Sequence, residues 1–595
     1  MEVILLMGLL FVGYIVAYLT YGRYLANRIF KLRKVCNVPS REFEDGVDYV
    51  PTKRGVIFGH HFTSIAGTGP IVGPAIAIVW GWVPAIIWVF VGSIFMGAVH
   101  DLGSMVISLR NQGKSIADIA ARYVNPRVQT IMFCVVFLEL LIVIAVFGLV
   151  IALLFRDYPQ AVFPIWCEIP IALVLGWAVY KRNGSVLWLT VAAVVAMYAT
   201  VIAGHWVYWD LPATILGIPL TGVWTIVLLI YAYVASTLPV TTLLQPRDYI
   251  NAWQLFVAMA LLIGGAVAAG LWGGMDLVSP TFDPTPAKAP PFWPFLFVTI
   301  ACGAISGFHC LVASGTSSKQ LGSERDALPV GYGSMLVEGA LAVLVIVVVA
   351  AGVGLAHEVE GQTLSGEAAW RHYYPGWLDD ASLSKKLAAY VEGSANMVRL
   401  LGIPREIALV VMGVFVASFA GTTLDTATRI QRYVIGELAT RARVPAVANR
   451  YVATLIAVVT AGAMAFSTGW GGSGAMTLWP MFGSLNQVLA ALALLIVTVY
   501  LRKKGGRKFL LTAIPCLFML VMTIWATVLN EWTFLFDAEV KKRSVLLAGI
   551  NGLTLILVLW MVIEVFVCFR GLKVEPQDED EGVPAATVPP ATGER

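Results

Sequence analysis

The chain has 595 residues, of which 58% are hydrophobic and only 13% are charged. Soluble domains carry roughly 25% charged residues, so this composition excludes a soluble protein. The formal net charge of +4 is small and dispersed, which argues against a nucleic-acid partner. The seven cysteines show no C-x-x-C spacing, and we expect neither a disulfide framework nor a metal site.

Long apolar segments dominate the chain, whose mean hydropathy is +0.80. Each is about 20 residues long, the length that a helix needs to cross a bilayer. The sequence therefore predicts an all-α polytopic membrane protein with about fifteen transmembrane helices. Their expected limits are 3–21, 56–80, 82–109, 128–155, 161–180, 185–207, 222–244, 250–272, 295–318, 329–355, 406–428, 451–468, 475–500, 509–529 and 545–569.

Basic residues orient these spans, because Lys and Arg concentrate in the cytoplasmic loops of membrane proteins. Most of the 40 Lys and Arg residues fall on one side if the N-terminus lies outside and the C-terminus inside. Within the core, residues 356–405 form a long outer loop, whose helical part either lies on the bilayer surface or covers an outer vestibule. The predicted parts are a first helix with a basic cytoplasmic loop, a transporter core, additional C-terminal helices and a disordered cytoplasmic tail, at 1–55, 56–430, 431–573 and 574–595.

The second span contains the sequence GHHFTSIAGTGPIVGP, residues 59–74. Pro70 lacks an N–H and frees the carbonyl of Ala66, while Gly67 and Gly69 lower the cost of unwinding. Unsatisfied backbone survives in a bilayer only where it lines a cavity or is buried in protein. The same stretch carries polar side chains, those of His60, His61, Ser64 and Thr68. We therefore predict a substrate or ion site on a discontinuous helix, the alternative being a kinked packing helix.

A second stretch of this kind is YVASTLPVTTLLQPRDY, residues 233–249. By the predicted topology it runs in the opposite direction to residues 59–74. Paired broken helices in inverted halves point to the central site of a secondary transporter and to an inverted five-helix repeat. The candidate site residues in this stretch are Thr237, Pro239, Thr241 and Gln245.

The predicted span 295–318 ends in a cluster of hydroxyl groups, within the sequence GFHCLVASGTSSKQL. Such a cluster is able to help coordinate a sodium ion, because hard cations prefer oxygen ligands. The candidate site residues here are His309, Ser314, Thr316 and Ser317.

Two carboxylates inside predicted spans are candidates for proton coupling, since an ionisable group in the membrane is costly unless it is paired or hydrated. Asp101 has no Lys or Arg three or four residues away, and a stripe of small and polar residues turns it away from lipid. It is our first choice for the proton-coupling group, the alternative being an interhelical pair with His61 or His309. Asp425 is the second candidate, although Arg429 at i+4 predicts a local ion pair.

Signatures of ATP-driven transport and of hydrolytic enzymes are missing from the chain, which has no P-loop, no H-E-x-x-H and no G-x-S-x-G with triad partners. We therefore expect an ion-coupled secondary transporter that is not an enzyme. It would need no cofactor other than a coupling cation, H⁺ or Na⁺. A channel and a membrane-embedded nutrient sensor without transport are the alternatives from other classes.

Several ordered strings between about residues 56 and 500 resemble the carbon starvation protein A (CstA) family. The strings are FGHHFTSIAGTGPIVGP, GAVHDLGSM, LLQPRDY, SGFHCLVASGT, GYGSMLVEG, TLDTATRIQRY and LWPMFGSLNQ. The resemblance implies a transporter of the bacterial inner membrane that responds to carbon starvation. With the orientation predicted from the basic residues, its N-terminus would lie in the periplasm and its C-terminus in the cytoplasm. It implies uptake of short peptides, or of pyruvate with protons. The implied fold is that of the amino acid–polyamine–organocation superfamily.

Overall fold

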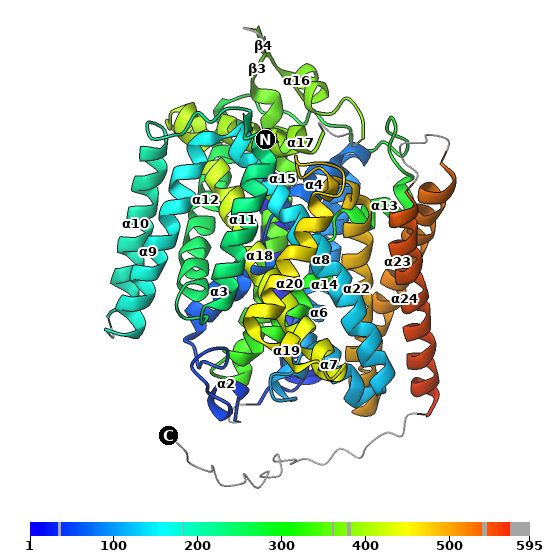
Figure 1. Ribbon diagram of the computed structural model, residues 1–595. Helices are drawn as coiled ribbons and strands as arrows, with labels where there is room; N and C mark the ends of the chain where they lie inside the picture. The colour runs from blue at the N-terminus through cyan, green and yellow to red at the C-terminus, as the bar shows by residue number, and fades with distance from the viewer. Residues whose placement is uncertain (34–36, 183, 360–361, 378–381, 538–543, 572–595) are drawn as a thin grey trace.

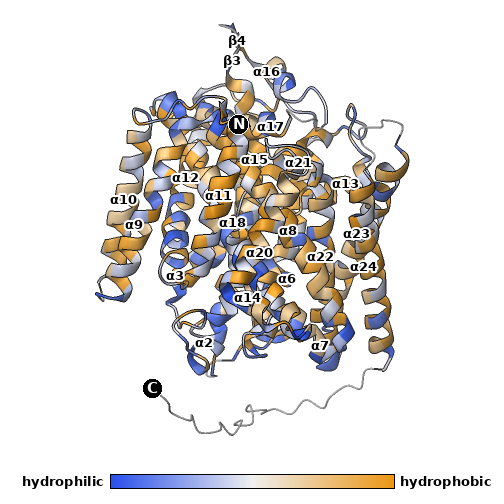
Figure 2. Cartoon of the chain, in the orientation of Figure 1, coloured by the Kyte–Doolittle hydropathy of each residue, from blue (hydrophilic) through white to orange (hydrophobic). Residues whose placement is uncertain are grey.

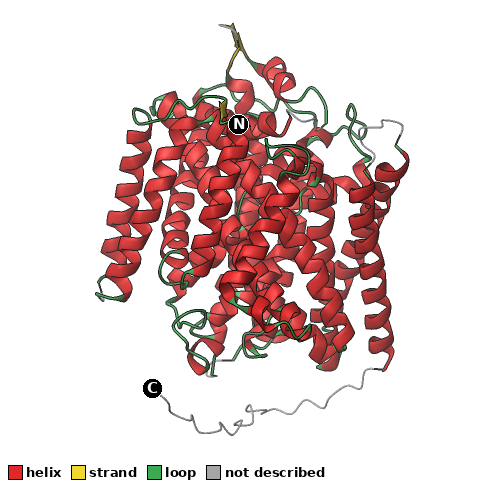
Figure 3. Ribbon diagram, in the orientation of Figure 1, coloured by secondary structure: helices red, strands yellow, loops and turns green. Residues whose placement is uncertain are grey.

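The computed structural model describes residues 1–33, 37–182, 184–359, 362–377, 382–537 and 544–571. Within them the chain is built almost entirely from helices that run side by side (Figure 3). Apolar residues cover the middle of the bundle and polar residues gather toward its two ends (Figure 2), as a bilayer requires. The tail predicted at 574–595 lies outside the described residues.

Thirteen spans in the described part of the chain are long and apolar enough to cross a membrane, by length and composition. They confirm a mostly helical polytopic membrane protein. Helices α3 with α4, and α5 with α6, each form one span. The helices of these spans are α1 (Glu2–Ala17), α3 (Arg54–Ile65), α4 (Gly69–Ala77), α5 (Trp82–Gly92), α6 (Ala98–Leu109), α8 (Pro126–Asp157), α9 (Val162–Tyr180), α10 (Val186–Gly204), α11 (Leu220–Thr237), α12 (Leu244–Trp272), α15 (Ser334–Ala350), α18 (Arg405–Arg441), α22 (Trp479–Lys503), α23 (Leu510–Phe536) and α24 (Val545–Gly571).

Two further segments were predicted as spans and have another form. Residues 451–468 correspond to the shorter apolar helix α20 (Arg450–Ala465). Residues 295–318 are divided between two short helices, α13 (Phe292–Thr299) and α14 (Gly307–Gly315). The remaining short elements are α2 (Pro39–Glu42), α7 (Ile116–Tyr123), α16 (Gly366–Tyr373), α17 (Ser382–Arg399), α19 (Pro445–Ala448), α21 (Gly474–Thr477) and the strand pairs β1–β2 (Thr214–Ile215, Ile218–Pro219) and β3–β4 (His357–Val359, Gln362–Leu364).

The interruption expected near Ala66 is present. Helix α3 ends at Ile65, and α4 begins at Gly69 after three residues that are not helical. Pro70 lies in the first turn of α4, where a missing N–H costs nothing, because the first N–H groups of a helix have no intrahelical partner. The proline therefore starts the second half-helix, and it does not kink a continuous one.

The prediction of a second broken helix at residues 233–249 is wrong. Residues 238–243 form the turn between the two separate spans α11 and α12. The second interruption is the segment 300–306, between α13 and α14. In Figure 1, α3 leads upward into α4 whereas α13 leads downward to α14, so the two interrupted segments run in opposite directions.

The long loop at 356–405 packs onto the bundle and is not a helix lying on the bilayer surface. Helix α17 packs against α4, α12, α15 and α18, and its Lys386 is buried. The Lys386 ammonium donates a hydrogen bond to the carbonyl of Tyr373 at 3.0 Å. Tyr374, just after α16, donates from its hydroxyl to the carbonyl of Ala75 in α4 at 2.6 Å. The loop therefore covers the end of the second half-helix.

Candidate functional site

The two helix interruptions lie against each other at the centre of the bundle. A Cβ placed on Gly69 would be 2.4 Å from Sγ of Cys302, and one placed on Gly73 would be 2.8 Å from the carbonyl oxygen of Thr299. Both distances are too short for any residue but glycine. Gly303 has φ +90°, a conformation that glycine adopts without strain. The glycines thus allow one broken backbone to approach the other.

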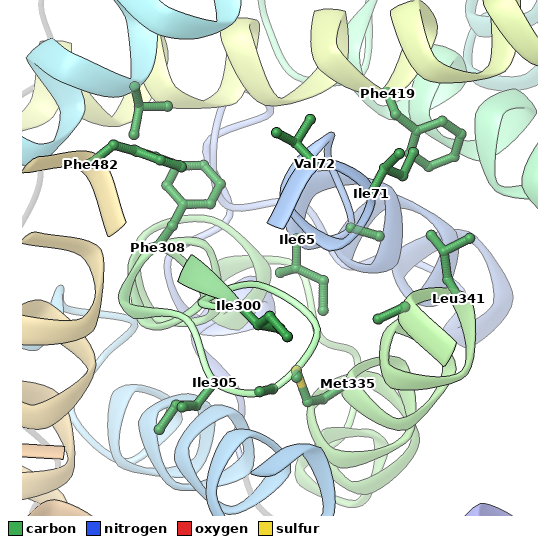
Figure 4. Close-up of a cluster of buried hydrophobic side chains, with 14 of the residues drawn as sticks. Ile65, Ile71, Val72, Ile300, Ile305, Phe308, Met335, Leu341, Phe419 and Phe482 are labelled. Atoms are coloured by element: carbon green, nitrogen blue, oxygen red, sulfur yellow. The ribbon is translucent and has the colours of Figure 1, made fainter. Parts of the chain in front are cut away.

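Apolar side chains surround this meeting point. Figure 4 shows Ile65 of the first interrupted segment close to Ile300 of the second, with Ile71 beside Phe419 and Phe308 beside Phe482. Phe419 of α18 and other large side chains close the cluster, and all of these are buried. The two breaks therefore lie within a shielded apolar environment, in which any charged group needs a partner.

An acid–imidazole cluster fills one side of the second interruption. We define it as His100, Asp101, His309 and Glu338, all fully buried. Asp101 of α6 accepts from Nδ1 of His100 at 2.8 Å and from Nδ1 of His309 at 3.0 Å. The predicted alternative, an interhelical pair between Asp101 and His309, is therefore present. The other ring nitrogen of His309 lies 3.3 Å from Oε2 of Glu338 in α15.

Glu338 connects this cluster to the backbone of the break, because its Oε1 accepts a hydrogen bond from the N–H of Gly303 at 2.9 Å. Ligand atoms of Cys302, His309 and Glu338 lie within 4.8 Å of one another, so these residues could hold a metal ion. The expectation that the protein needs no metal stays a prediction. A chain of acid, imidazole and acid spanning α6, α14 and α15 is able to hold and pass a proton.

A second buried cluster surrounds Arg247. We define the Arg247 cluster as Arg247, Glu168, Asp248 and Asp425, which come from α12, α9, α12 and α18. The guanidinium bonds Asp425 directly and lies 3.4 Å from Asp248 and 3.7 Å from Glu168. Tyr231 of α11 also contacts Arg247, and it donates to Asp425 at 2.9 Å. One guanidinium thus serves three carboxylates.

The predicted local pair between Asp425 and Arg429 is wrong. Arg247, distant in sequence, takes Asp425, while Arg429 pairs with Asp48 at 3.1 Å. Asp48 lies in the loop before α3 and also accepts from the Tyr433 hydroxyl at 2.6 Å. Burial alone would raise the pKa of Asp48, but the charge of Arg429, the Tyr433 hydrogen bond and the charges of Lys319 and Arg432 together lower it. This pair therefore fixes the loop before α3 to α18 as an ionised contact.

The candidate residues of the first interruption have separate partners. His60 binds Oδ2 of Asp248 at 2.6 Å, and Ser64 lies 3.5 Å from the same oxygen. His61 binds Oγ of Ser317 at 2.7 Å. Both residues were predicted to belong to the site, and the structure places them in contact. Gly67 packs against α18, where its Cβ would be 1.9 Å from Oγ1 of Thr423. Ala66 and Thr68 are buried beside it.

The residues predicted around Pro239 do not reach the facing breaks. Thr237, Pro239 and Thr241 are only half buried in and beside the turn between α11 and α12, and Thr237 donates to the carbonyl of Val234. Gln245 is buried and donates to Thr52 and to Gln320 at 2.9 and 2.8 Å.

Most of the hydroxyl groups predicted to coordinate sodium are engaged in hydrogen bonds with neighbouring protein groups. Ser314 donates to the carbonyl of Cys310 at 2.6 Å, and Ser317 contacts His61. Ser318 donates to the carbonyl of Ser314 at 3.0 Å, whereas Oγ1 of Thr316 has no hydrogen-bond partner among the described residues. These groups point to different partners, so the structure gives no support to a shared sodium site.

Glu168, Arg247 and Asp248 were missed as site residues. The span that contains the last two was predicted to begin at residue 250, whereas α12 begins at Leu244. That boundary placed both charges outside the membrane. Glu168 is a single carboxylate inside the apolar helix α9, and a charge within a span is by itself a signal of function.

Interrupted membrane helices that meet beside buried charge clusters are typical of transport proteins. The chain belongs to the carbon starvation protein CstA family, whose sequence model matches residues 2–369 and 377–526. Its relatives bear the names of transporters, so the chain is a membrane transporter and not an enzyme.

Three relatives show the extent of the similarity. The peptide transporter CstA of Campylobacter jejuni is 32% identical over 571 residues, covering 86% of this chain and 78% of that protein. The pyruvate/proton symporter BtsT of Escherichia coli is 31% identical, with 86% and 79% covered. The peptide transporter CstA of Escherichia coli is 30% identical, with 90% and 82% covered. Among solved structures, MhsT in complex with L-phenylalanine has a TM-score of 0.48 and 11% identity, covering 87% of this chain and 99% of that one.

Proposed function

We propose that this chain is a proton-coupled secondary transporter of the bacterial inner membrane that takes up short peptides or pyruvate during carbon starvation. The names of its relatives support both substrates, and one of them is a proton symporter. The observation that carries the proposal is the acid–imidazole cluster at the point where two broken helices meet. Protons are favoured over sodium, because the buried acids have imidazole partners and most of the predicted sodium ligands are engaged in hydrogen bonds with other protein groups.

The two interrupted segments support an inverted repeat of five spans. The second set would be α13/α14, α15, α18, α20 and α22. The first set would be α3/α4, α5/α6, α8, α11 and α12, with the pair α9 and α10 inserted between its third and fourth members. The third members, α8 and α18, pack along each other, as do α4 and α15 near the breaks. Together with α1, α23 and α24 this arrangement has fifteen segments, thirteen of which are long and apolar enough to cross a membrane, and it extends the repeat to α22, beyond the predicted core at 56–430.

Protonation of the acid–imidazole cluster would couple the proton to the movement of the breaks. Asp101 holds His309 from α6, and Glu338 holds the backbone of Gly303 from α15. Adding or removing a proton changes the attraction between these groups in a medium that screens charge poorly. The change would alter how tightly α14 is held to α6 and α15. Movement of α14 would in turn change whether the site is accessible from one side of the membrane or the other. Asp425, in the Arg247 cluster, is the second candidate for a coupling carboxylate.

Counterflow in proteoliposomes distinguishes a carrier from the alternative classes. Liposomes with the purified protein and loaded with unlabelled pyruvate or dialanine should accumulate the labelled compound transiently, because a carrier exchanges substrate across the membrane. A channel would show flux without this stimulation from the opposite side. A sensor would show no flux, and either result would contradict the proposal.

We further propose that the N-terminus and the loop at 356–405 face the periplasm. Both lie at one end of the bundle, opposite to the connection between α22 and α23 (Figure 1). In a background without native cysteines, Thr363→Cys should react with a membrane-impermeant maleimide in intact spheroplasts. Arg507→Cys, in the connection, should react only after lysis. The reverse labelling pattern would overturn the orientation.

A further inference from the structure

A cavity lies beside the Arg247 cluster, between α8, α9, α11 and α18. The cavity is small and opens to the outside, and its empty volume of about 380 Å³ includes that open space, so a substrate would have to widen it. Glu168, Arg247, Tyr231 and Ser418 contribute the polar part of its lining, and apolar side chains such as Ile151 and Leu228 form the rest. A cavity with apolar walls and a few convergent polar groups is the usual form of a small-molecule site.

The charges around this cavity do not balance. Arg247 is the one permanent cation of the cluster, and it faces three carboxylates, Glu168, Asp248 and Asp425. The other titratable groups that face the cluster are Tyr231 of α11 and His60 of α3, which binds Asp248. Even if His60 is protonated, the ionised acids outnumber the cations. A further negative charge would be costly in this buried cluster, so entry of another anion favours uptake of a proton by one of the carboxylates.

Glu168 is the carboxylate with the weakest hold on Arg247. The guanidinium Nε lies 3.7 Å from Oε1 of Glu168, and neither atom has a hydrogen-bond partner among the described residues. Both residues line the cavity and both are buried. The second oxygen of Glu168 accepts a hydrogen bond from the Ser418 hydroxyl at 2.9 Å, and Asn251 is a further hydrogen-bonding neighbour of this carboxylate. A donor on Arg247 and an acceptor on Glu168 are therefore available to an occupant of the cavity.

We propose that the carboxylate of the transported substrate binds Arg247 in this cavity while Glu168 takes up a proton. The inference rests on the proposed transport function and names the group that recognises its substrates. Pyruvate and short peptides share a carboxylate, which a guanidinium binds through paired hydrogen bonds. The proton passes from water to a Glu168 oxygen, and the negative charge that Glu168 loses is replaced by that of the substrate. The net charge beside Arg247 thus stays the same.

The same site is connected to the first broken helix. Asp248 contacts Arg247 on one side and His60 of α3 on the other, at 3.4 and 2.6 Å. A new anion on Arg247 would weaken the hold of Arg247 on Asp248. Binding in the cavity would therefore change the attachment of α3 to α12. In this way the bound substrate would affect the interruption at the end of α3.

Ligand binding to the purified protein in nanodiscs tests this inference. Calorimetric titration with pyruvate and with its neutral amide, and with dialanine and its C-terminal amide, should show a preference for at least one acid over its amide. Affinity for the acid should rise on acidification by up to about tenfold per pH unit, the slope for uptake of one proton. Glu168→Gln should bind the acid with little dependence on pH. Arg247→Lys should lose most of the preference for acid over amide.

A cavity-filling variant tests the site without altering its charges. Gly421 of α18 lines the cavity, and a Cβ placed there meets no atom within 4 Å, so Gly421→Leu should fold and block binding. Gly436→Leu, on the same helix away from the cavity, is the matched control, because its Cβ meets only a carbonyl at 3.9 Å. Glu531→Gln and Arg502→Lys are the corresponding controls for loss of an acid and of a guanidinium.

The outcomes separate this inference from the proposed function. If the wild-type protein shows no proton-driven uptake, the proposed function fails. If uptake is proton-driven, but Gly421→Leu binds normally and Glu168→Gln keeps the pH dependence of binding, the substrate lies elsewhere and the inference alone is overturned. Binding of acid and amide with equal affinity by the wild type would also overturn it, since Arg247 would then recognise no carboxylate.

Discussion

Replacing Asp101 with asparagine is expected to abolish accumulation of substrate against its gradient while preserving exchange across the membrane. Asparagine keeps the size of the side chain and can accept from one of the two histidines and donate to the other, if that imidazole has an unprotonated Nδ1, but it cannot carry or release a proton. A carrier without its coupling proton equilibrates its substrate and does not concentrate it. We expect exchange to slow by less than about tenfold, which corresponds to about 1.4 kcal/mol in the barrier.

Uptake driven by an imposed pH gradient, and counterflow without a gradient, should be measured on the same proteoliposomes. Asp283→Asn, in an exposed loop outside the spans, is the control and should behave as the wild type. An Asp101→Asn variant that still concentrates substrate would show that Asp101 has a structural role. The coupling proton would then be assigned to the Arg247 cluster, with Glu168 and Asp425 as the next residues to replace.

Replacing Gly67 with alanine should stop transport, even though it adds only one carbon atom. The new Cβ would lie 1.9 Å from Oγ1 and 3.0 Å from Cβ of Thr423, so the break between α3 and α4 must move away from α18. Overpacking of this kind costs typically 1–3 kcal/mol, roughly, and distorts the arrangement in which the two breaks meet. We expect uptake to fall below detection while the protein still inserts and folds with a lowered melting temperature.

A second substitution on the opposite helix tests whether this contact is the cause. Thr423→Ala removes the hydroxyl at 1.9 Å and leaves the Cβ at 3.0 Å, so the double variant should regain part of the lost transport. Gly55→Ala in α3 is the matched control, because its Cβ would meet nothing within 4 Å. Normal uptake by Gly67→Ala would show that the close approach of α3 and α18 is not needed for transport.

The spans and the first interruption could be predicted from the sequence because they depend on local properties. Apolar length marks a membrane helix, and glycines before Pro70 mark the start of a half-helix. The predicted position of the second interruption is wrong because that prediction also relied on local properties. Two prolines near Leu238 suggest a broken helix, whereas residues 300–306 contain none. The break at 300–306 depends on long-range contacts. The Gly303 N–H donates to Glu338, and the Phe308 N–H donates to Asn486.

The partners of charged residues were the least predictable part of the site. Helical spacing favours Arg429 as the partner of Asp425. An argument from spacing can identify only partners within the same helix. The fold brings Arg247 to the same carboxylate from a distant segment, and leaves Arg429 to Asp48. The pair of Asp101 with His309 could be predicted as an alternative, since both residues lie inside predicted spans. Only the folded bundle shows that Glu338 also contacts His309.

Uptake into proteoliposomes under separately imposed gradients tests the central claim, that this chain couples substrate transport to protons. Labelled pyruvate and labelled dialanine should each be presented with an inward pH gradient, with an inward sodium gradient, and with neither. We predict that at least one substrate accumulates above its external concentration under the pH gradient alone, and that a protonophore removes the effect. Accumulation driven only by sodium, or equilibration without accumulation under every gradient, would contradict the account.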